Sequence, residues 1–579
     1  MRNFLSYFII FLFIFIGSCS RRTAPDKVPA NEIEPLEVKF FIENPSTIKE
    51  IEQRNEIMSR LIKNYLDTMG LSKIIKDTYR VDYLQSLFIS LYKDNDYKLL
   101  WNAEYRPSDD LKELIGYVKN VRNLGLEPND YNFNHMEKLI DQAYVEGVLH
   151  DVLPLIMLDL CASSSAIVLA SHLNAGKISP DKIDSAWFVN PPKLDYAKYV
   201  NRALDEGSIK ESFTNLQPNM KYYWSLAKKL KEYRKLKADG GFPPLPNASR
   251  LDGGDTSDLV LPVKRFLATT GDLGQNFAKN SKLSKNFKEA LRQYQMRMDC
   301  EVTGDLNEAT IEAMLVPIDQ RIETIGLNME RLRWFEQFEN KYIMINVPQF
   351  KMRIIEDEKE VIGMKIVVGK EYDSTPMFSD KLEYIVFNPH WTVPYSIASE
   401  EMLPKIKANP GYLPSNNYKL LDGWGRNANE VDPYRVNWSN ISEDNFPYVI
   451  VQQSGSFNAL GAVKFMFPNN YSIYMHDTPA KYLFEKDDRD YSHGCIRLEN
   501  PFELAEHLLR NKAGWDQQKQ QEIMNKEEPV NVNLPVPIPV HIVYLTSWVD
   551  KYGNLNFRDD IYGHDVAQKK AIEIKEEAL

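Results

Sequence analysis

Residues 491–501, YSHGCIRLENP, place a cysteine between a His-Gly pair and an Ile-Arg pair. A structural cysteine needs only apolar neighbours, whereas a nucleophilic cysteine needs a base, donors for an oxyanion and a positive local field. His493 and Gly494 precede Cys495, and Arg497 lies two residues after it. The types and spacing of these residues predict that Cys495 is a nucleophile.

Two histidines are candidates for the base that takes the thiol proton. In an extended chain, residues i and i+2 share a face, so His493 can lie beside Cys495. His476 ends a strand-like segment, NNYSIYMH, that could run antiparallel to the segment of Cys495. The spacing alone leaves both candidates open.

Backbone amides and an arginine could complete such a site. Glycine lets the backbone approach a substrate closely, so the amides of Gly494 and Cys495 could donate to a developing oxyanion. Arg497 shares the face of Cys495 if the chain stays extended, where it would favour the thiolate or bind a carboxylate. The alternative is a buried thiol beside a core histidine. The complete His-Gly-Cys-aliphatic-Arg run, with its upstream His-x-Thr, argues against it.

The motif SHGCIRL with its upstream MHDT resembles the catalytic signature of the L,D-transpeptidases of the YkuD type. FNPHWTVPYSI (387–397), QSGSFNALGAVKFMFPN (453–469) and FRDDIYG (557–563) resemble the large multidomain periplasmic members of that family. Residues 84–131 and 161–180 resemble their N-terminal scaffold domain. The resemblance implies an α+β chain, in which a mainly β catalytic domain of the L,D-transpeptidase sandwich type follows helical domains.

The resemblance also implies roles for individual residues. Cys495 matches the nucleophile and His476, rather than His493, matches the general base, with the backbone carbonyl of Asp477 orienting the ring. Other motif positions shape the site: His493, Gly494 and Arg497. Residues that match no established role in the family are candidates for packing or substrate binding: Trp391, Asn458 and the aromatic residues of 396–446, among them Trp424. Tyr474 is a further candidate for substrate binding.

The reaction implied by the resemblance is acyl transfer. Cys495 attacks the third residue of a tetrapeptide donor stem of peptidoglycan, D-alanine leaves, and a thioester remains. A diaminopimelate-type amine of a second stem then attacks, which joins two third residues. Carbapenems are the typical inhibitors of this family. No cofactor and no metal are expected, because the chain lacks H-x-x-E-H and paired-cysteine ligand spacings.

Other activities compete with this interpretation. An L,D-carboxypeptidase or cross-link hydrolase of the same fold would use water instead of the amine, and the sequence separates the two poorly. A papain-like or NlpC-type peptidase places its cysteine before its histidine partner, whereas His476 precedes Cys495 here. A non-catalytic wall-binding lipoprotein would tolerate a degraded motif, and this motif is intact.

The N-terminus, MRNFLSYFIIFLFIFIGSCS, predicts export. Arg2 precedes an apolar run at residues 4–16, too short for a comfortable membrane span, and small residues follow it. The ending Ile-Gly-Ser-Cys resembles the lipobox of bacterial lipoproteins, in which Cys19 would carry the lipid. An ordinary signal peptide or an uncleaved anchor is the alternative. We expect a periplasmic, membrane-anchored lipoprotein with a signal peptide at 1–19 and a tether at 20–45.

Cysteine usage and charge exclude two classes of protein. If Cys19 is lipidated, the widely spaced Cys161, Cys300 and Cys495 remain, and an odd number argues against a disulfide framework. The net charge of −11 and the pI near 5.5 argue against nucleic acid as a partner.

Hydrophobic periodicity divides the rest of the chain. Residues 46–250 read as a helical scaffold domain, and the apolar segment 153–170 reads as a core helix rather than a membrane span. Residues 255–317 resemble a three-helix peptidoglycan-binding-like domain, with Asn307 as an N-cap. The inward-facing residues expected there are Phe287, Ala290, Leu291, Tyr294, Ile311, Met314 and Leu315.

After residue 338 the period changes to that of strands. We expect the catalytic domain at 338–550 and a C-terminal tail at 551–579. The aperiodic segment 396–446 is rich in aromatic residues, which favours an ordered lid over a disordered loop.

Overall fold

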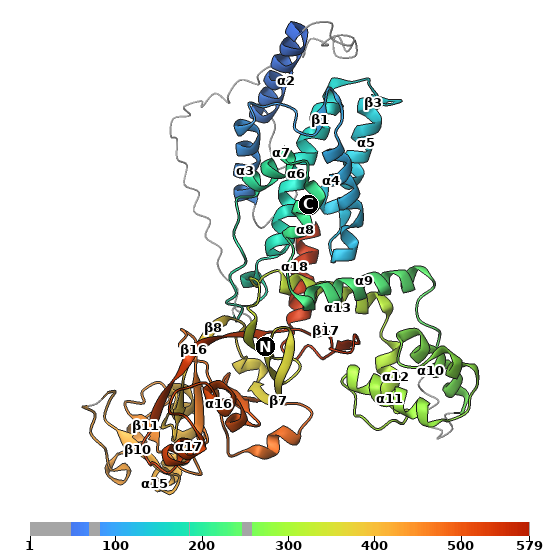
Figure 1. Ribbon diagram of the computed structural model, residues 1–579. Coiled ribbons are helices and arrows are strands. Elements are labelled where there is room, and N and C mark those ends of the chain that lie inside the picture. Colours follow the sequence, from blue (N-terminus) through green and yellow to red (C-terminus); the bar gives the residue numbers. More distant parts are fainter. Residues whose placement is uncertain (1–47, 69–80, 185, 246–256, 426, 578–579) are drawn as a thin grey trace, which may run out of the picture.

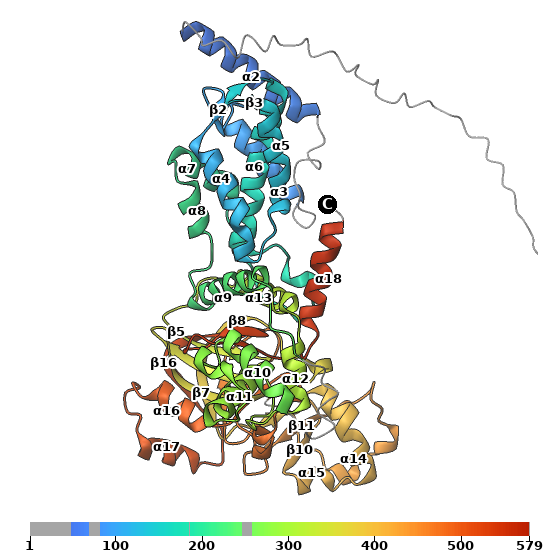
Figure 2. The ribbon, with the colours of Figure 1, turned by 90° about the vertical axis from the view of Figure 1, so that its right-hand side faces the viewer.

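The structure is a computed structural model that describes residues 48–68, 81–184, 186–245, 257–425 and 427–577. A helical bundle stands at one end and a β domain at the other (Figures 1 and 2). Helices α9 (Lys221–Ala238) and α13 (Ile318–Leu332) lie between them. The predicted α+β class is confirmed. The expected signal peptide, tether and lipidation site at Cys19 lie outside the described residues.

The bundle surrounds α6 (Val152–Ala175), which is buried along nearly its whole length. By length and composition α6 could cross a membrane, but it forms the core of the bundle, as predicted for 153–170. Asp159 of α6 is fully buried, and its carboxylate accepts hydrogen bonds from the Tyr92 hydroxyl (2.7 Å) and the Trp101 amide (2.9 Å). The surrounding helices are α2 (Ile48–Thr68), α3 (Val81–Asp94), α4 (Asp109–Asn120), α5 (Phe133–Ala143), α7 (Tyr196–Asp205) and α8 (Ile209–Asn215).

The predicted three-helix unit is present as α10 (Ser257–Thr270), α11 (Lys285–Arg297) and α12 (Glu308–Leu315). Asn307 caps α12, since its side chain accepts a hydrogen bond from the Thr310 amide (2.9 Å). The prediction for Leu315 was wrong: at the last turn of α12 its side chain is 45% exposed. The other residues expected to face inward are buried: Phe287, Ala290, Leu291, Tyr294, Ile311 and Met314.

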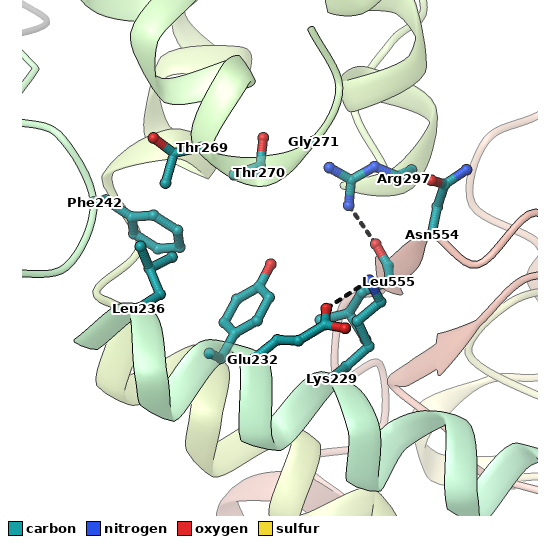
Figure 3. Close-up of a pocket in the computed structure, with 11 residues that line it drawn as sticks. Lys229, Glu232, Leu236, Phe242, Thr269, Thr270, Gly271, Arg297, Asn554 and Leu555 are labelled. Atoms are coloured by element: carbon teal, nitrogen blue, oxygen red, sulfur yellow. Dashed lines mark hydrogen bonds and ion pairs between the residues drawn. The ribbon is translucent and has the colours of Figure 1, made fainter. Parts of the chain in front are cut away.

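A cavity of about 290 Å³ marks where this unit meets α9 and strand β18 (Leu555–Phe557) (Figure 3). Arg297, at the end of α11, forms a buried ion pair with Asp272 and donates a hydrogen bond to the Leu555 carbonyl. Lys229 and Glu232 of α9 pair with each other on the facing wall (2.9 Å). Arg297 therefore ties the three-helix unit to the C-terminal part of the chain.

The β domain is built on a nine-stranded sheet that closes into a barrel. The strand order is β14-β7-β15-β13-β12-β8-β16-β5-β6, and β6 pairs back with β7. Alternate residues face the core, for example Ile343, Ile385 and Phe465, all fully buried. The strands are β5 (Lys341–Asn346), β6 (Lys351–Glu356), β7 (Lys359–Gly369), β8 (Ser379–Phe387), β12 (Val463–Met466), β13 (Met475–His476), β14 (Asp490–Ser492), β15 (Ile496–Leu498) and β16 (Val530–Val543).

The segment expected to be a lid is an ordered subdomain at the end of the molecule farthest from the bundle (Figure 1). Its sheet has the order β10 (Tyr418–Leu421), β11 (Val449–Gln452) and β9 (Trp391–Thr392). Helical segments Ile397–Met402, α14 (Leu403–Ala408) and α15 (Tyr412–Ser415) pack on it. Buried residues such as Ile406, Leu413 and Ile450 give this subdomain a hydrophobic core of its own.

Within the part of the expected tail that the structure describes, residues 551–577 are packed against the rest of the chain, contrary to expectation. Strand β18 pairs with β17 (Ser547–Val549), and helix α18 (His564–Glu577) packs against α13. Asp565 forms an ion pair with the fully buried Arg331 (2.7 Å), and Gln568 donates a hydrogen bond to the Leu327 carbonyl (3.2 Å). The segment is held because its apolar and polar groups complete the junction between the barrel and the helices.

Candidate active site

Strands β12, β13 and β15 bring the candidate residues together on the outer face of the barrel. Phe465, Met475 and Ile496 are fully buried and point into the core. Side chains alternate along a strand, so the residues between them lie on the opposite face. The pairs Lys464↔His476 and His476↔Arg497 set them side by side. This outer-face group comprises Lys464, Tyr474, His476, Cys495 and Arg497.

The strand of His476 runs parallel to that of Cys495, not antiparallel as expected. The chain leaves β13, passes through the helical turn Lys481–Glu485 and β14, and re-enters the sheet in the same direction. The Ile496 amide donates to the Tyr474 carbonyl (3.1 Å), which fixes Tyr474 beside Cys495.

The Cys495 thiol is half-buried and protonated at rest. Its sulfur donates to the Ser472 carbonyl, with Sγ 3.7 Å from the oxygen. Burial raises the pKa of Cys495 above its usual value, while hydrogen bonds from Tyr474 and the charges of Lys464 and Arg497 act in the opposite direction. The cations and the Tyr474 hydroxyl therefore stabilise the thiolate once it forms.

The His476 imidazole is oriented by a backbone carbonyl. Its Nδ1 hydrogen-bonds the Asp477 carbonyl (2.5 Å), the contact that the family resemblance implied. A carbonyl can only accept, so Nδ1 carries the proton and Nε2 is the basic nitrogen. Burial, followed by the charge of Arg497, lowers the pKa of His476 to about 3. The ring is thus a neutral base at neutral pH.

Asp477 is itself held firmly. Its carboxylate accepts a hydrogen bond from the Ala462 amide (2.9 Å) and pairs with Lys481 (2.8 Å). Its amide donates to the Val463 carbonyl (2.9 Å). These contacts make Asp477 a rigid support for the ring of His476, since both its backbone and its side chain are anchored.

His493 pairs with Glu401 and not with the thiol, which instead hydrogen-bonds Ser472, contrary to the expectation from an extended chain. Gly494 has a φ of 100°, which turns the chain between β14 and β15 and separates the directions of residues 493 and 495. His493 Nε2 instead lies 2.6 Å from Glu401 Oε1. Glu401 belongs to the helical segment Ile397–Met402 of the lid subdomain. His493 therefore links this subdomain to the loop at residues 492–495, here called the nucleophile loop after the predicted role of Cys495.

Both backbone polar groups of Gly494 are hydrogen-bonded within the protein. Its amide donates to the Ser492 hydroxyl (3.2 Å), so it is not free to stabilise an oxyanion as expected. Its carbonyl accepts a hydrogen bond from Thr375 Oγ1 (2.8 Å). The Cys495 amide has no acceptor among the described residues, and it remains the backbone donor at the site.

Lys464 was not singled out from the sequence. Its ammonium nitrogen lies 3.6 Å from the centroid of the Tyr474 ring, and this ring makes an edge contact with His476 at 5.7 Å. Burial raises the pKa of the Tyr474 hydroxyl, which keeps it a donor. The signal for Lys464 was the alternation in AVKFMFPN, where a lone lysine stands between core residues.

The candidates for substrate binding lie in different environments. Trp391, on strand β9 of the lid subdomain, interacts with the Tyr474 side chain and opposes the rise in its pKa. Trp424 is 77% exposed on that subdomain. Asn458 is only 1% exposed, and its amide nitrogen donates to the Pro389 (3.0 Å) and Gln453 (2.9 Å) carbonyls. The prediction that Asn458 binds substrate was therefore wrong, because its polar side-chain atoms are hydrogen-bonded to the backbone of a buried turn.

Two protein families match this chain. Residues 340–538 match the L,D-transpeptidase catalytic domain (YkuD), and residues 86–230 match the Scaffold domain. A Haemophilus influenzae protein named "Putative L,D-transpeptidase" is 35% identical over 243 residues, which cover 42% of this chain and 48% of the relative. The chain thus spans about half the length of this relative.

Solved structures add only weak similarity. An L,D-transpeptidase from Mycobacterium smegmatis is 10% identical, with 36% of this chain and 61% of that chain covered and a TM-score of 0.17. L,D-transpeptidase 3 from Mycobacterium tuberculosis is 12% identical, with 36% and 63% covered and a TM-score of 0.17. The chain therefore contains an L,D-transpeptidase catalytic domain of the YkuD type behind an N-terminal Scaffold domain.

Proposed function

We propose that this protein cross-links peptidoglycan by joining the third residues of two stem peptides through a thioester on Cys495. The observation that carries the proposal is the pairing of β12, β13 and β15. It places a half-buried thiol, a neutral imidazole and two cations on one face of the barrel. A nucleophile, a base and a positive field are what cysteine acyl transfer requires.

In the first half-reaction, Sγ of Cys495 attacks the carbonyl of the third residue of a tetrapeptide stem. The thiol proton passes to Nε2 of His476, and the Cys495 amide donates to the developing oxyanion. The oxyanion collapses, the bond to D-alanine breaks, and the leaving amine takes the proton from the imidazolium. A thioester on Cys495 remains.

In the second half-reaction, a diaminopimelate-type amine of another stem attacks the thioester. His476 accepts the proton that the amine loses, and the departing thiolate of Cys495 takes it back. Lys464 and Arg497 stabilise the thiolate as it forms and as it leaves, since both lie close enough to favour its charge. The product is an amide between two third residues.

Hydrolysis is the competing outcome, because water can replace the amine at the thioester. The contact between Glu401 and His493 brings the lid subdomain against the nucleophile loop, and a covered thioester favours transfer over hydrolysis. Purified protein incubated with disaccharide tetrapeptide, with products identified by mass spectrometry, separates the two. We expect cross-linked dimers; tripeptide alone would identify an L,D-carboxypeptidase.

A non-catalytic wall-binding role is tested by carbapenem treatment. A carbapenem should add one covalent adduct to the wild-type protein and none to Cys495→Ala. Sedimentation with purified peptidoglycan should be the same for both proteins. An equal increase in protein mass after carbapenem treatment of the wild type and of Cys495→Ala would contradict the assignment of Cys495 as the nucleophile.

We also propose that the protein is a periplasmic lipoprotein anchored through Cys19, with the wall as its substrate. The support is the lipobox-like ending of the apolar N-terminal run. Metabolic labelling with a fatty-acid analogue should tag the wild type and not Cys19→Ala. Labelling of both proteins would contradict this anchor.

A further inference from the structure

A second cavity, of about 570 Å³, lies on the outside of strands β5 and β6. Around the barrel, β8 and β16 separate these strands from β12 on one side, and β7 separates them from β15 on the other. The cavity is therefore on the opposite wall from Cys495. Its other walls come from the start of α9 and from the hairpin of β17 and β18.

The floor of this cavity presents a guanidinium group. Arg353 is only 9% exposed, and its Nε donates to Glu360 (3.0 Å). Within the described residues its two terminal nitrogens have no hydrogen-bond partner. A buried guanidinium fork with both terminal nitrogens free is the group that binds a carboxylate bidentately.

The surroundings of Arg353 have an excess of positive charge. Lys351 pairs with the same Glu360 (2.8 Å), so two cations share one carboxylate. Burial, followed by the charge of Arg353, lowers the pKa of Lys351, and Lys551 lines the same cavity. An anionic ligand would relieve this repulsion.

The other carboxylates that line the cavity are engaged. Glu339 lies 3.0 Å from His541, and Glu358 is 3.9 Å from Lys221. Asp550 accepts hydrogen bonds from two backbone amides of its own turn (2.9 Å each). Because these carboxylates already have partners, the terminal nitrogens of Arg353 are hydrogen-bond donors that remain available to a ligand in the cavity.

Aromatic side chains form the walls. Phe338, Tyr342 and Trp548 are buried beside the floor, and Tyr552 stands 77% exposed at the rim. The volume falls in the range of sites for small ligands, about 300–1,000 Å³. The cavity thus combines apolar walls with a cationic floor, at a size that suits a short peptide end rather than a folded partner.

We propose that this cavity is a second, non-catalytic site that binds the free carboxyl end of a stem peptide. The inference rests on the proposed function, which makes stem peptides the ligands at hand. A terminal carboxylate would lie on Arg353, and the adjoining methyl group would lie against the aromatic wall. Such a site would hold the protein on the wall while the Cys495 site turns over.

Isothermal titration calorimetry of the full chain tests this site. Cys495→Ala, which cannot turn over, is titrated with a free tetrapeptide stem. We expect two equivalents bound, and one equivalent for Cys495→Ala with Arg353→Gln added. A tetrapeptide with a carboxamide end should also lose the second equivalent. The matched control is Arg292→Gln, an exposed arginine of the three-helix unit, which should keep two.

One equivalent in Cys495→Ala that Arg353→Gln leaves unchanged would overturn the proposal. If Arg353→Gln lowers the thermal midpoint, the titration is repeated with Lys551→Gln, a substitution at the exposed rim of the cavity. In that variant the affinity for the second equivalent of tetrapeptide should fall at least tenfold, and an unchanged affinity would contradict the site. Carbapenem acylation of Arg353→Gln with Cys495 intact should match the wild type. Loss of acylation in both proteins would instead defeat the proposed function and leave the second-site measurement valid.

Discussion

At the residue scale, the site holds a protonated thiol and a neutral imidazole rather than a ready-made ion pair. Cys495, His476 and Arg497 could be selected from the sequence because their spacing matches a specific motif. The positions of His493 and of the Gly494 amide could not be predicted from the sequence, because both depend on the positive φ of Gly494. A spacing of two residues predicts a shared face only while the chain stays extended.

The pKa values predict the pH dependence of acylation. The pKa of His476 is about 3, so the base is already neutral throughout pH 5–9 and adds no rise near pH 6.5. The pKa of Cys495 is raised, so the thiol stays protonated over most of this range. Because the reacting pair is then the thiol and the neutral imidazole throughout, the rate of carbapenem acylation, followed by stopped-flow fluorescence, should change little from pH 5 to pH 8. A rise in rate centred near pH 6.5 would contradict this assignment.

Lys464 offers a test of the positive field. Lys464→Met removes a cation beside the sulfur and keeps a chain of similar length. The thiol pKa should rise by about one unit, and acylation at pH 7 should slow about tenfold. The control is Lys365→Met, which removes a lysine of β7 that donates to the Phe484 carbonyl. Equal rates for Lys464→Met and the wild type would remove Lys464 from the site.

At the element scale, the segment that leaves the helical bundle braces the nucleophile loop. Phe188 donates its amide to the Met377 carbonyl (2.9 Å), and its ring stacks on Tyr471 at 3.9 Å. Tyr471 precedes Ser472, whose carbonyl holds the Cys495 thiol. No periodicity in the sequence links residue 188 to residue 471, since only the folded chain brings them together.

Removing this brace should affect acylation more than stability. Phe188 is 40% exposed, so Phe188→Ala should cost little folding free energy while releasing Tyr471. We expect carbapenem acylation to slow about tenfold, as small displacements of reacting groups do. Phe277→Ala, at a 45% exposed residue of the three-helix unit, is the matched control. Unchanged acylation in Phe188→Ala would show that the brace has no influence on the thiol.

The lid contact predicts how products divide. Glu401→Ala removes the partner of His493 and loosens the subdomain over the thioester. Water should then compete better, so the ratio of tripeptide to dimer should rise several-fold by mass spectrometry. Asp432→Ala, on the same subdomain with an exposed partner in Arg435, should leave the ratio unchanged. A fall in the ratio for Glu401→Ala would contradict a covering role.

At the scale of the whole molecule, one histidine sits where the bundle, the barrel and the C-terminal helix meet. His564 is 2% exposed and packs against Trp187 and Tyr544, and its Nε2 has no hydrogen-bond partner among the described residues. Burial, then Arg331, lower its pKa from 6.5 to about 4. The folded protein therefore excludes a proton that the unfolded chain takes up below about pH 6.5.

This difference makes the junction less stable in acid. The titration of His564 leaves the free energy of unfolding unchanged well above pH 6.5, and it lowers that free energy progressively as the pH falls towards 4. At pH 5.5 the cost is about 1 kcal/mol relative to pH 7.5. His564→Phe keeps the aromatic packing and removes the titration, so its thermal midpoint should fall less than that of the wild type over this range. Parallel slopes for the two proteins would contradict the role of His564.

The organisation of the whole chain was predictable where local patterns decide it. The core helix at 153–170, the three-helix unit and the strands after residue 338 follow from periodicity. The parallel pairing of β13 with β15 and the docking of residues 551–577 do not, because they depend on contacts such as that of Asp565 with Arg331 across the junction. Asn458 was misjudged because burial cannot be read from residue type alone.

The most direct test of this account is the mass of the protein trapped during turnover with disaccharide tetrapeptide. After acid quench, peptide mapping should place a disaccharide-tripeptidyl thioester on the peptide that contains Cys495, with D-alanine released in equal amount. Cys495→Ala should carry no adduct. An adduct that persists in Cys495→Ala, or that maps to Cys161 or Cys300, would contradict it.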